Sequence, residues 1–156
     1  MNWKEYITEH INPIVQDTTF EFNTAARNDQ LGELRLQLQI NELPEQLEDL
    51  YNQTNGIQEI LSGQLVGELV WPVERVIQTN KEYRSIPDFA ELYMSFDQLL
   101  FFSDAGNGDL FGFVILQGKA DRPDIFHWNH EDDSRTWIAA DLKQFLKGWA
   151  DGTIQV

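Results

Sequence analysis

The sequence predicts an α+β fold, a single domain in which a mixed or antiparallel β-sheet is flanked by helices. Three observations lead to this prediction. The chain has 156 residues, which suits one domain. Helical patterns fill most of its first half, strand patterns dominate the second, and a further helix closes it. The dipeptide Asn107-Gly108 lies between two apolar runs, which is the strongest short signal for a β-hairpin.

The first element expected is a short amphipathic helix that ends near Pro13. Its apolar side follows i, i+3, i+4, i+7 spacing and consists of Trp3, Tyr6, Ile7 and His10. Phe20 and Phe22 come next, in a stretch that is expected to be irregular.

The segment Asp29–Gln37 has an ambiguous pattern. Leucines three and four residues apart fit a helix, whereas Leu34, Leu36 and Leu38 also alternate as in a strand. Gly32 weakens a helix by about 1 kcal/mol relative to alanine. We nevertheless predict a helix here.

Pro44 is expected at the first position of the next helix, because its missing N–H costs nothing there. Acidic residues follow it, near the positive end of the helix dipole. One face of this helix is predicted to contain Leu47, Leu50, Tyr51 and Thr54. Asn55-Gly56 then supplies a left-handed residue that stops the helix.

Leu65–Trp71 has the composition of a strand, and Pro72 is expected to begin another helix. The next two strands are Leu99–Ser103 and Asp109–Leu116, on either side of the Asn-Gly turn. Ile125–Trp128 and Thr136–Ala139 are predicted as two further strands. They are joined by an acidic loop that contains Glu131, Asp132 and Asp133.

The C-terminal helix is the clearest element of the sequence. Asp141 is placed to cap it and Gly152 to end it. Its apolar stripe is predicted to consist of Leu142, Phe145, Leu146 and Trp149.

Charge and composition exclude several classes of protein. The 26 acidic and 11 basic residues give a formal net charge of −15. Such a surface repels nucleic acids and anionic membranes and attracts basic proteins. The absence of cysteine excludes disulfides, Fe–S clusters and cysteine-ligated zinc. No apolar run reaches the roughly 20 residues that span a bilayer, and the N-terminus has no signal-peptide core, so we expect a cytoplasmic protein.

The best candidates for a catalytic centre are His127 and His130, with Asp132 and Asp133 close in the sequence. A metal-dependent hydrolase using His130 with one of these aspartates is a remote alternative. On a strand the two histidines point to opposite faces, and they share a side only if the strand ends at Trp128. We therefore predict no metal site and no catalytic centre at these residues.

Asp104 and Asp109 flank a glycine-rich segment with oxygen ligands. It lacks the EF-hand pattern that calcium requires. A tight turn explains Gly106 and Gly108 through their freedom at positive φ.

A series of short motifs is more specific than any one of them. In chain order it reads Leu43-Pro44, Leu50-Tyr51, Asn55-Gly56, Trp71-Pro72-Val73, Gly106-Asn107-Gly108-Asp109, Ile125–Trp128, Ile138-Ala139 and Phe145-Leu146. In this order and spacing the chain resembles the Smi/Knr-type family of the SUKH superfamily, over about residues 28–150.

The resemblance implies a compact α+β domain that needs no cofactor and carries out no catalysis. Bacterial members resemble cytoplasmic immunity proteins that neutralise a cognate toxin, often a nuclease domain. Fungal members of similar fold act as scaffolds in cell-wall regulation, so a non-catalytic regulatory role is the alternative. The motif residues interpreted as structural are Leu43, Pro44, Tyr51, Asn55, Gly56, Trp71, Gly106 and Gly108.

A basic toxin domain is the partner that fits both the resemblance and the charge. The residues predicted to contact it combine acidic and aromatic side chains: Asp104, Asp109, Trp128, His130, Glu131, Asp132 and Asp133. For Asp109 the alternative is that it caps its own turn. Trp71, Trp128 and Trp137 are either interface anchors or residues of the sheet and core.

Overall fold

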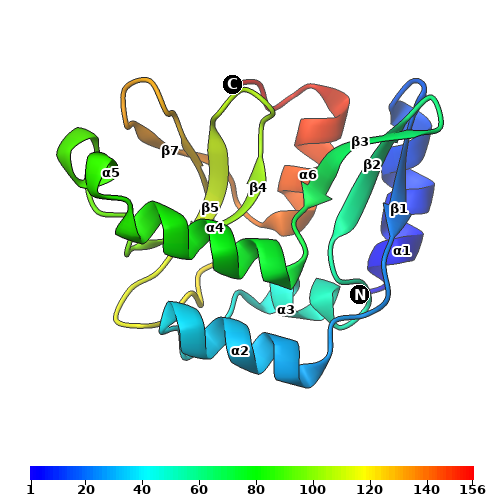
Figure 1. Ribbon diagram of the computed structural model, residues 1–156. Coiled ribbons are helices and arrows are strands. Elements are labelled where there is room, and N and C mark those ends of the chain that lie inside the picture. The colour runs from blue at the N-terminus through cyan, green and yellow to red at the C-terminus, as the bar shows by residue number, and fades with distance from the viewer.

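Seven strands form two antiparallel sheets in the computed structural model, which describes residues 1–156 (Figure 1). The elements in chain order are α1 (Trp3–Tyr6), η1 (Ile7–Ile11), η2 (Asn12–Ile14), β1 (Thr18–Phe22), α2 (Asn28–Leu38), α3 (Glu45–Tyr51), β2 (Ile57–Leu61), β3 (Gln64–Val70), α4 (Val73–Ser85), α5 (Pro87–Leu92), β4 (Leu99–Asp104), β5 (Leu110–Val114), β6 (Ile125–Trp128), β7 (Arg135–Ala139) and α6 (Leu142–Asp151). None of the helices has the length and apolar character needed to cross a membrane.

The sheets have the strand orders β1-β2-β3 and β4-β5-β6-β7. They adjoin where the Trp71 amide donates to the Phe102 carbonyl oxygen at 2.9 Å. The Ser103 hydroxyl adds a bond of 2.6 Å to the Leu69 carbonyl oxygen. The predicted α+β class is confirmed, with two antiparallel sheets in place of one mixed sheet.

Helices cover both faces of the β4–β7 sheet, because successive residues of a strand point to opposite sides. Phe101 faces α4, where the buried Asn80 amide bonds to the backbone N–H and C=O of Phe101. Phe102 faces α6, and its ring centroid lies 5.5 Å from that of Phe145. In Figure 1, α4 crosses in front of this sheet and α6 lies behind it. The main core therefore lies in two layers, one on each side of the strands.

The helix predicted over Asp29–Gln37 is confirmed as α2. The alternating leucines do not mark a strand, because Leu36 is 72% exposed while Leu34 and Leu38 are buried. Gln39, in the left-handed conformation with φ of 58°, ends the helix.

Several predictions in the first half were wrong. Phe20 and Phe22 lie in β1, not in an irregular stretch, because β2 pairs with that segment. Pro44 precedes α3 instead of occupying its first helical position, since its ψ of 131° is extended. The helix ends at Tyr51, with Asn52 as its C-cap, so Thr54 is not on its face and Asn55-Gly56 does not end it. The strand β2 and the helix α5 had not been predicted.

Gly56 precedes β2 and lies against the backbone of Val70 and Pro72, just before the start of α4. Its φ is +90°, and a Cβ atom added there would lie 2.8 Å from the Val70 carbonyl oxygen and 2.8 Å from the Pro72 nitrogen. These are backbone atoms, which cannot rotate away. Only glycine fits both the conformation and the space at this position.

Gly56→Ala is expected to lower the free energy of unfolding by about 2–3 kcal/mol, by combining left-handed strain with backbone displacement. The matched control is Gly63→Ala, which has a similar φ of +82° but no atom within 4 Å of the added Cβ. Gly63→Ala adds only the left-handed strain, so it is expected to lower the free energy of unfolding by about 1 kcal/mol. Urea unfolding measures both, and equal losses would show that the backbone contacts do not matter.

Candidate functional site

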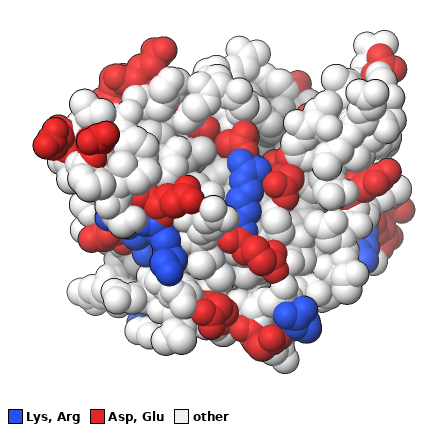
Figure 2. Space-filling model, in the orientation of Figure 1, with Lys and Arg blue, Asp and Glu red and all other residues white.

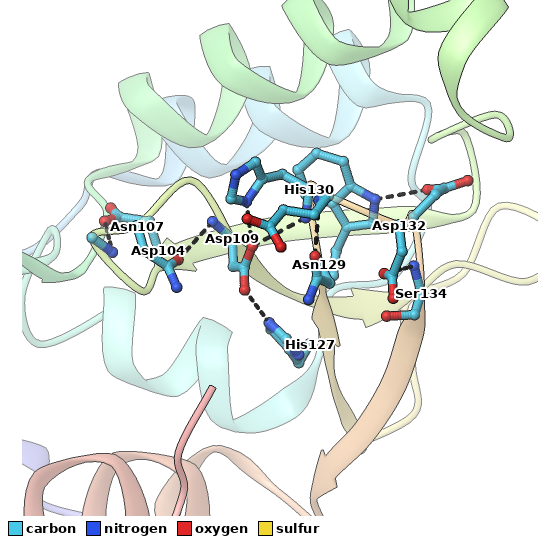
Figure 3. Close-up of polar contacts among 12 residues, drawn as sticks. Asp104, Asn107, Asp109, His127, Asn129, His130, Asp132 and Ser134 are labelled. Carbon is cyan, nitrogen blue, oxygen red and sulfur yellow. Dashed lines mark hydrogen bonds and ion pairs between the residues drawn. The ribbon is translucent and has the colours of Figure 1, made fainter.

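Two connections meet at one end of the β4–β7 sheet (Figure 3). One is the turn between β4 and β5, residues 105–109, which holds the Asn-Gly dipeptide. The other connects β6 to β7 over residues 129–134 and is called the acidic loop below, because it contains Glu131, Asp132 and Asp133. The predicted hairpin is confirmed, with strands β4 and β5 on either side of its turn.

The side chain of Asp109 joins the two connections. Only 4% of it is exposed, and it accepts three hydrogen bonds. The donors are His127 Nε2 at 2.7 Å, the His130 amide at 3.0 Å and His130 Nδ1 at 2.5 Å. One buried carboxylate thus fixes an imidazole of β6 and the first part of the acidic loop. Figure 3 shows Asp109 between the two histidines.

Burial raises the pKa of the Asp109 carboxyl, but the hydrogen bonds from His130 and His127 outweigh it and hold the pKa below its usual range. The carboxylate is therefore ionised at neutral pH and acts as the acceptor for both imidazoles. Gly108 makes room for this arrangement, since a Cβ there would lie 3.0 Å from the His130 ring.

The side chain of Asp133 anchors the other end of the acidic loop. It accepts hydrogen bonds from Trp128 Nε1 at 2.7 Å, from the Met94 amide at 2.8 Å and from Arg135 Nη2 at 3.1 Å. Burial raises the pKa of Asp133, and these bonds more than offset that and leave the pKa lowered. The loop is thereby tied both to its own sheet and to the segment that follows α5.

Aromatic rings form the floor beneath the acidic loop. Trp128 is 2% exposed, and its ring makes edge-to-face contacts with Tyr83, Tyr93 and Phe96 at centroid distances of 5.1–5.8 Å. The Tyr93 hydroxyl donates to the His130 carbonyl oxygen at 2.9 Å. A rigid base of this kind restricts the motion of the backbone above it.

The acidic loop presents two carboxylates to solvent, those of Glu131 and Asp132. Side-chain turns hold the backbone at both positions: the Glu131 amide donates to Asn129 Oδ1, and the Ser134 amide to Asp132 Oδ1. Hydrogen bonds from Ser134 lower the pKa of Asp132. His130 stands beside them with 38% of its side chain exposed. The loop is thus a fixed, negatively charged surface.

The other predicted contact residues are placed differently. Asp109 and Trp128 are buried, so neither has surface to offer a partner; Asp109 fixes its own turn and loop, as its alternative interpretation proposed. Asp104 is directed toward Trp71 and Arg75, with bonds of 2.8 and 3.1 Å to them, and contacts neither histidine. Sequence reasoning missed Tyr93 and Arg135, which support the loop, because no local pattern connects them to it.

Several motif residues lie where the fold needs them. The Tyr51 hydroxyl donates to the Trp71 carbonyl oxygen at 2.7 Å within the core. Asn55 Oδ1 accepts from the Val73 amide at 2.8 Å, at the start of α4. Leu43, Pro44 and Trp71 are buried, and Gly106 and Gly108 both have positive φ in the hairpin turn.

The two histidines come together because β6 ends at Trp128, which was the condition stated for them to share a side. They meet on Asp109, and no group of three or more His, Asp or Glu side chains is arranged to hold a metal ion. Neither imidazole bonds to Asp132 or Asp133, and none of their hydrogen bonds involves a hydroxyl nucleophile. What the arrangement offers chemically is a display of fixed negative charge.

Acidic side chains also outnumber basic ones over the face shown in Figure 2.

A comparison with family models matches residues 30–146, about three quarters of the chain, to the SUKH_6 model, described as SMI1-KNR4 cell-wall. No curated protein matches the sequence. A match of this extent covers α2 from its third residue, all the strands except β1, the whole acidic loop and the first half of α6. The chain therefore belongs to the SMI1-KNR4 family of the SUKH superfamily.

Proposed function

We propose that this chain is a cytoplasmic immunity protein that binds and neutralises a basic toxin domain, such as a nuclease, through its acidic loop. The observation that carries the proposal is the fixing of this loop at both ends, which leaves Glu131 and Asp132 exposed and unpaired with any cation. Membership of the family is consistent with an immunity-type protein. The net charge of −15 agrees with a basic partner.

Charge complementarity explains how such a protein reaches its target quickly. A nuclease domain binds phosphate, so its substrate face is positive. Complementary charges raise association rate constants from about 10⁵–10⁶ to about 10⁸ M⁻¹s⁻¹ or more at low salt. Since the acidic loop is already ordered, little conformational entropy is lost when it docks.

Charge reversal of the loop, Glu131→Lys with Asp132→Lys, is expected to slow association with the toxin domain about tenfold or more. Under the proposal the adjacent open reading frame is expected to encode this basic domain, and stopped-flow kinetics with it at low and high salt give the rate. The matched control is Glu9→Lys with Glu21→Lys, which changes the net charge equally at exposed residues of η1 and β1.

Equal slowing by both double variants would mean that only the total charge matters and would remove the acidic loop from the proposal. Growth rescue by the wild-type protein when the toxin domain is co-expressed tests neutralisation itself. A failure of rescue, with no complex on co-purification, would contradict the immunity role.

The second candidate is a non-catalytic regulatory or scaffolding protein of the same fold. The description of the matching family model, which names the cell wall, favours it. Under this alternative the neighbouring genes encode no toxin, and the native complex recovered by co-purification contains a cell-wall regulatory component instead.

A further inference from the structure

The outer edge of β7 is unpaired over Arg135–Trp137, because β7 is the last strand of its sheet. We infer that it is a docking edge for an extended, basic strand of the partner protein, with Trp137 as the anchoring side chain. The inference rests on the proposed function only in assuming that the partner is the same basic protein. It adds a second contact, of a different physical kind, beside the acidic loop.

The hydrogen-bond pattern of the β6–β7 ladder shows which groups point outward. The Asn129 amide donates to the Ser134 carbonyl oxygen at 2.9 Å, just beyond the paired strands. Antiparallel ladders alternate between bonded and non-bonded pairs, so Thr136 bonds to His127 while Arg135 and Trp137 face away. By this alternation the backbone N–H and C=O groups of Arg135 and Trp137 point away from β6, and they take part in no backbone hydrogen bond in the turns and loops.

The edges of the other sheet are less available. At β1, the Phe20 amide donates to Asn12 Oδ1 at 3.0 Å, so the N-terminal segment closes that edge. β3 is open only before it reaches β4, and β-bulges interrupt its pairing with β2. Bulges twist an edge away from regular pairing. β7 has one irregularity, near its C-terminal end, and a regular register over Arg135–Trp137.

Trp137 has the properties of an interface anchor. It is 52% exposed, whereas Trp71 and Trp128 are buried. Its indole Nε1 donates to Asp124 Oδ1 at 2.9 Å, which holds the ring in place on the sheet. A large ring that is already fixed loses little entropy when a partner covers it, and tryptophan is enriched among residues that dominate binding energy. Trp71, Trp128 and Trp137 were each predicted to be either an interface anchor or a residue of the sheet and core, and Trp137 is the one of the three that is exposed.

The charges along this edge indicate which kind of strand can pair with it. Arg135 is compensated by Asp133 at 3.1 Å and donates to the Met94 and Ser95 carbonyl oxygens, so it offers no free cation. Asp124 lies beside Trp137, and the acidic loop leads directly into β7. A second copy of this chain pairing across β7 would bring like charges together, which is unfavourable. A strand bearing lysine or arginine complements these carboxylates and places cations near the indole face.

The test uses the full-length, ¹⁵N-labelled protein and a synthetic strand-forming peptide of about seven alternating lysine and valine residues. Titration is expected to shift the amide signals of Arg135, Thr136 and Trp137 and the indole signal of Trp137. Replacing each lysine by glutamate is expected to abolish binding. N-methylation of the peptide at alternate residues leaves the protein untouched and is expected to weaken binding about fivefold per blocked hydrogen bond.

Trp137→Ala is expected to weaken peptide binding about tenfold or more. The control is Leu65→Ala, at a residue 60% exposed on the β3 edge, with an expected change below about twofold. The inference is overturned if the peptide shifts β3 instead of β7, if N-methylation has no effect, or if it does not bind. A dimer of twice 18.2 kDa in sedimentation that Trp137→Ala dissociates would make a second copy the occupant and also overturn it.

A failure of the docking-edge inference can be distinguished from a failure of the proposed function. If Glu131→Lys with Asp132→Lys disrupts toxin binding and Trp137→Ala leaves it unchanged, the edge inference fails and the immunity role stands. If the peptide pairs with β7 but co-expression gives no protection from the toxin domain, the docking edge stands and the immunity role fails.

Discussion

Asp109→Ala is expected to lower the free energy of unfolding by about 3 kcal/mol, which corresponds to a fall of about 10 °C in Tm for a domain of this size. The carboxylate is buried and satisfies three donors from His127 and His130. The substitution leaves the buried His127 imidazole N–H without its acceptor and opens a space between the two connections. Urea and thermal unfolding measure the loss.

Asp132→Ala is the matched control, because Asp132 lies in the same loop but is exposed and bonds only to the neighbouring Ser134. Its expected cost is below about 1 kcal/mol. Amide hydrogen exchange adds a local readout: Asp109→Ala is expected to remove protection of the His130 amide, which donates to that carboxylate. Similar costs for the two variants would mean that Asp109 does not hold the loop.

The same carboxylate makes stability depend on pH in a defined direction. The pKa of Asp109 is lower in the folded protein than its ordinary value, so its contribution is present above the ordinary pKa. That contribution is lost as the pH falls below about 4 and through the lowered pKa. Asp109→Asn removes the titration, so its stability is expected to fall less steeply than that of the wild type across this acid range.

The local signals in the sequence predicted the elements that build the site. The Asn107-Gly108 dipeptide predicted the hairpin, because the residue preferences of a β-turn depend on only four consecutive residues. Asp141 and the apolar stripe defined α6, since a cap and a period of 3.6 are both local features. The position of the acidic loop between β6 and β7 followed from the same kind of information.

The parts that sequence reasoning missed depend on long-range pairing. β1 and β2 are short strands that form by pairing with each other, and the paired residues lie between 35 (Phe22 with Ile57) and 43 (Thr18 with Leu61) positions apart in the chain. The α5 segment carries no fully buried residue and is held by contacts such as Phe89 with Tyr83. Neither type of information is present in a short stretch of sequence.

The site was predicted in part for the same reason. Glu131 and Asp132 are exposed, as acidic residues in a loop usually are. The burial of Asp109 could not be inferred, because it depends on His127 and His130, which lie 18 and 21 residues farther along the chain. The change in the direction of the backbone after Trp128 brings both histidines to it.

Trp128→Ala is expected to destabilise the protein by about 4 kcal/mol, the largest effect predicted for any single residue of the site. The ring is 2% exposed and lies against Tyr83, Tyr93, Phe96 and Phe101, so its removal leaves a large cavity beneath the acidic loop. Trp137→Ala is the matched control, because that ring is half exposed and its loss is expected to cost less than about 1 kcal/mol.

Trp128→Phe tests the anchoring role with a smaller loss of packing, because it keeps an aromatic ring in the core and removes the N–H that donates to Asp133 Oδ1 together with part of the indole. The Asp133 carboxylate retains the Met94 amide and Arg135 as donors, so the expected loss of stability is about 1–2 kcal/mol. If the fixed loop is what a basic partner recognises, this variant should dissociate from the toxin domain several-fold faster than the wild type while remaining folded. Unchanged dissociation in a folded Trp128→Phe protein would show that the partner does not depend on the order of the loop.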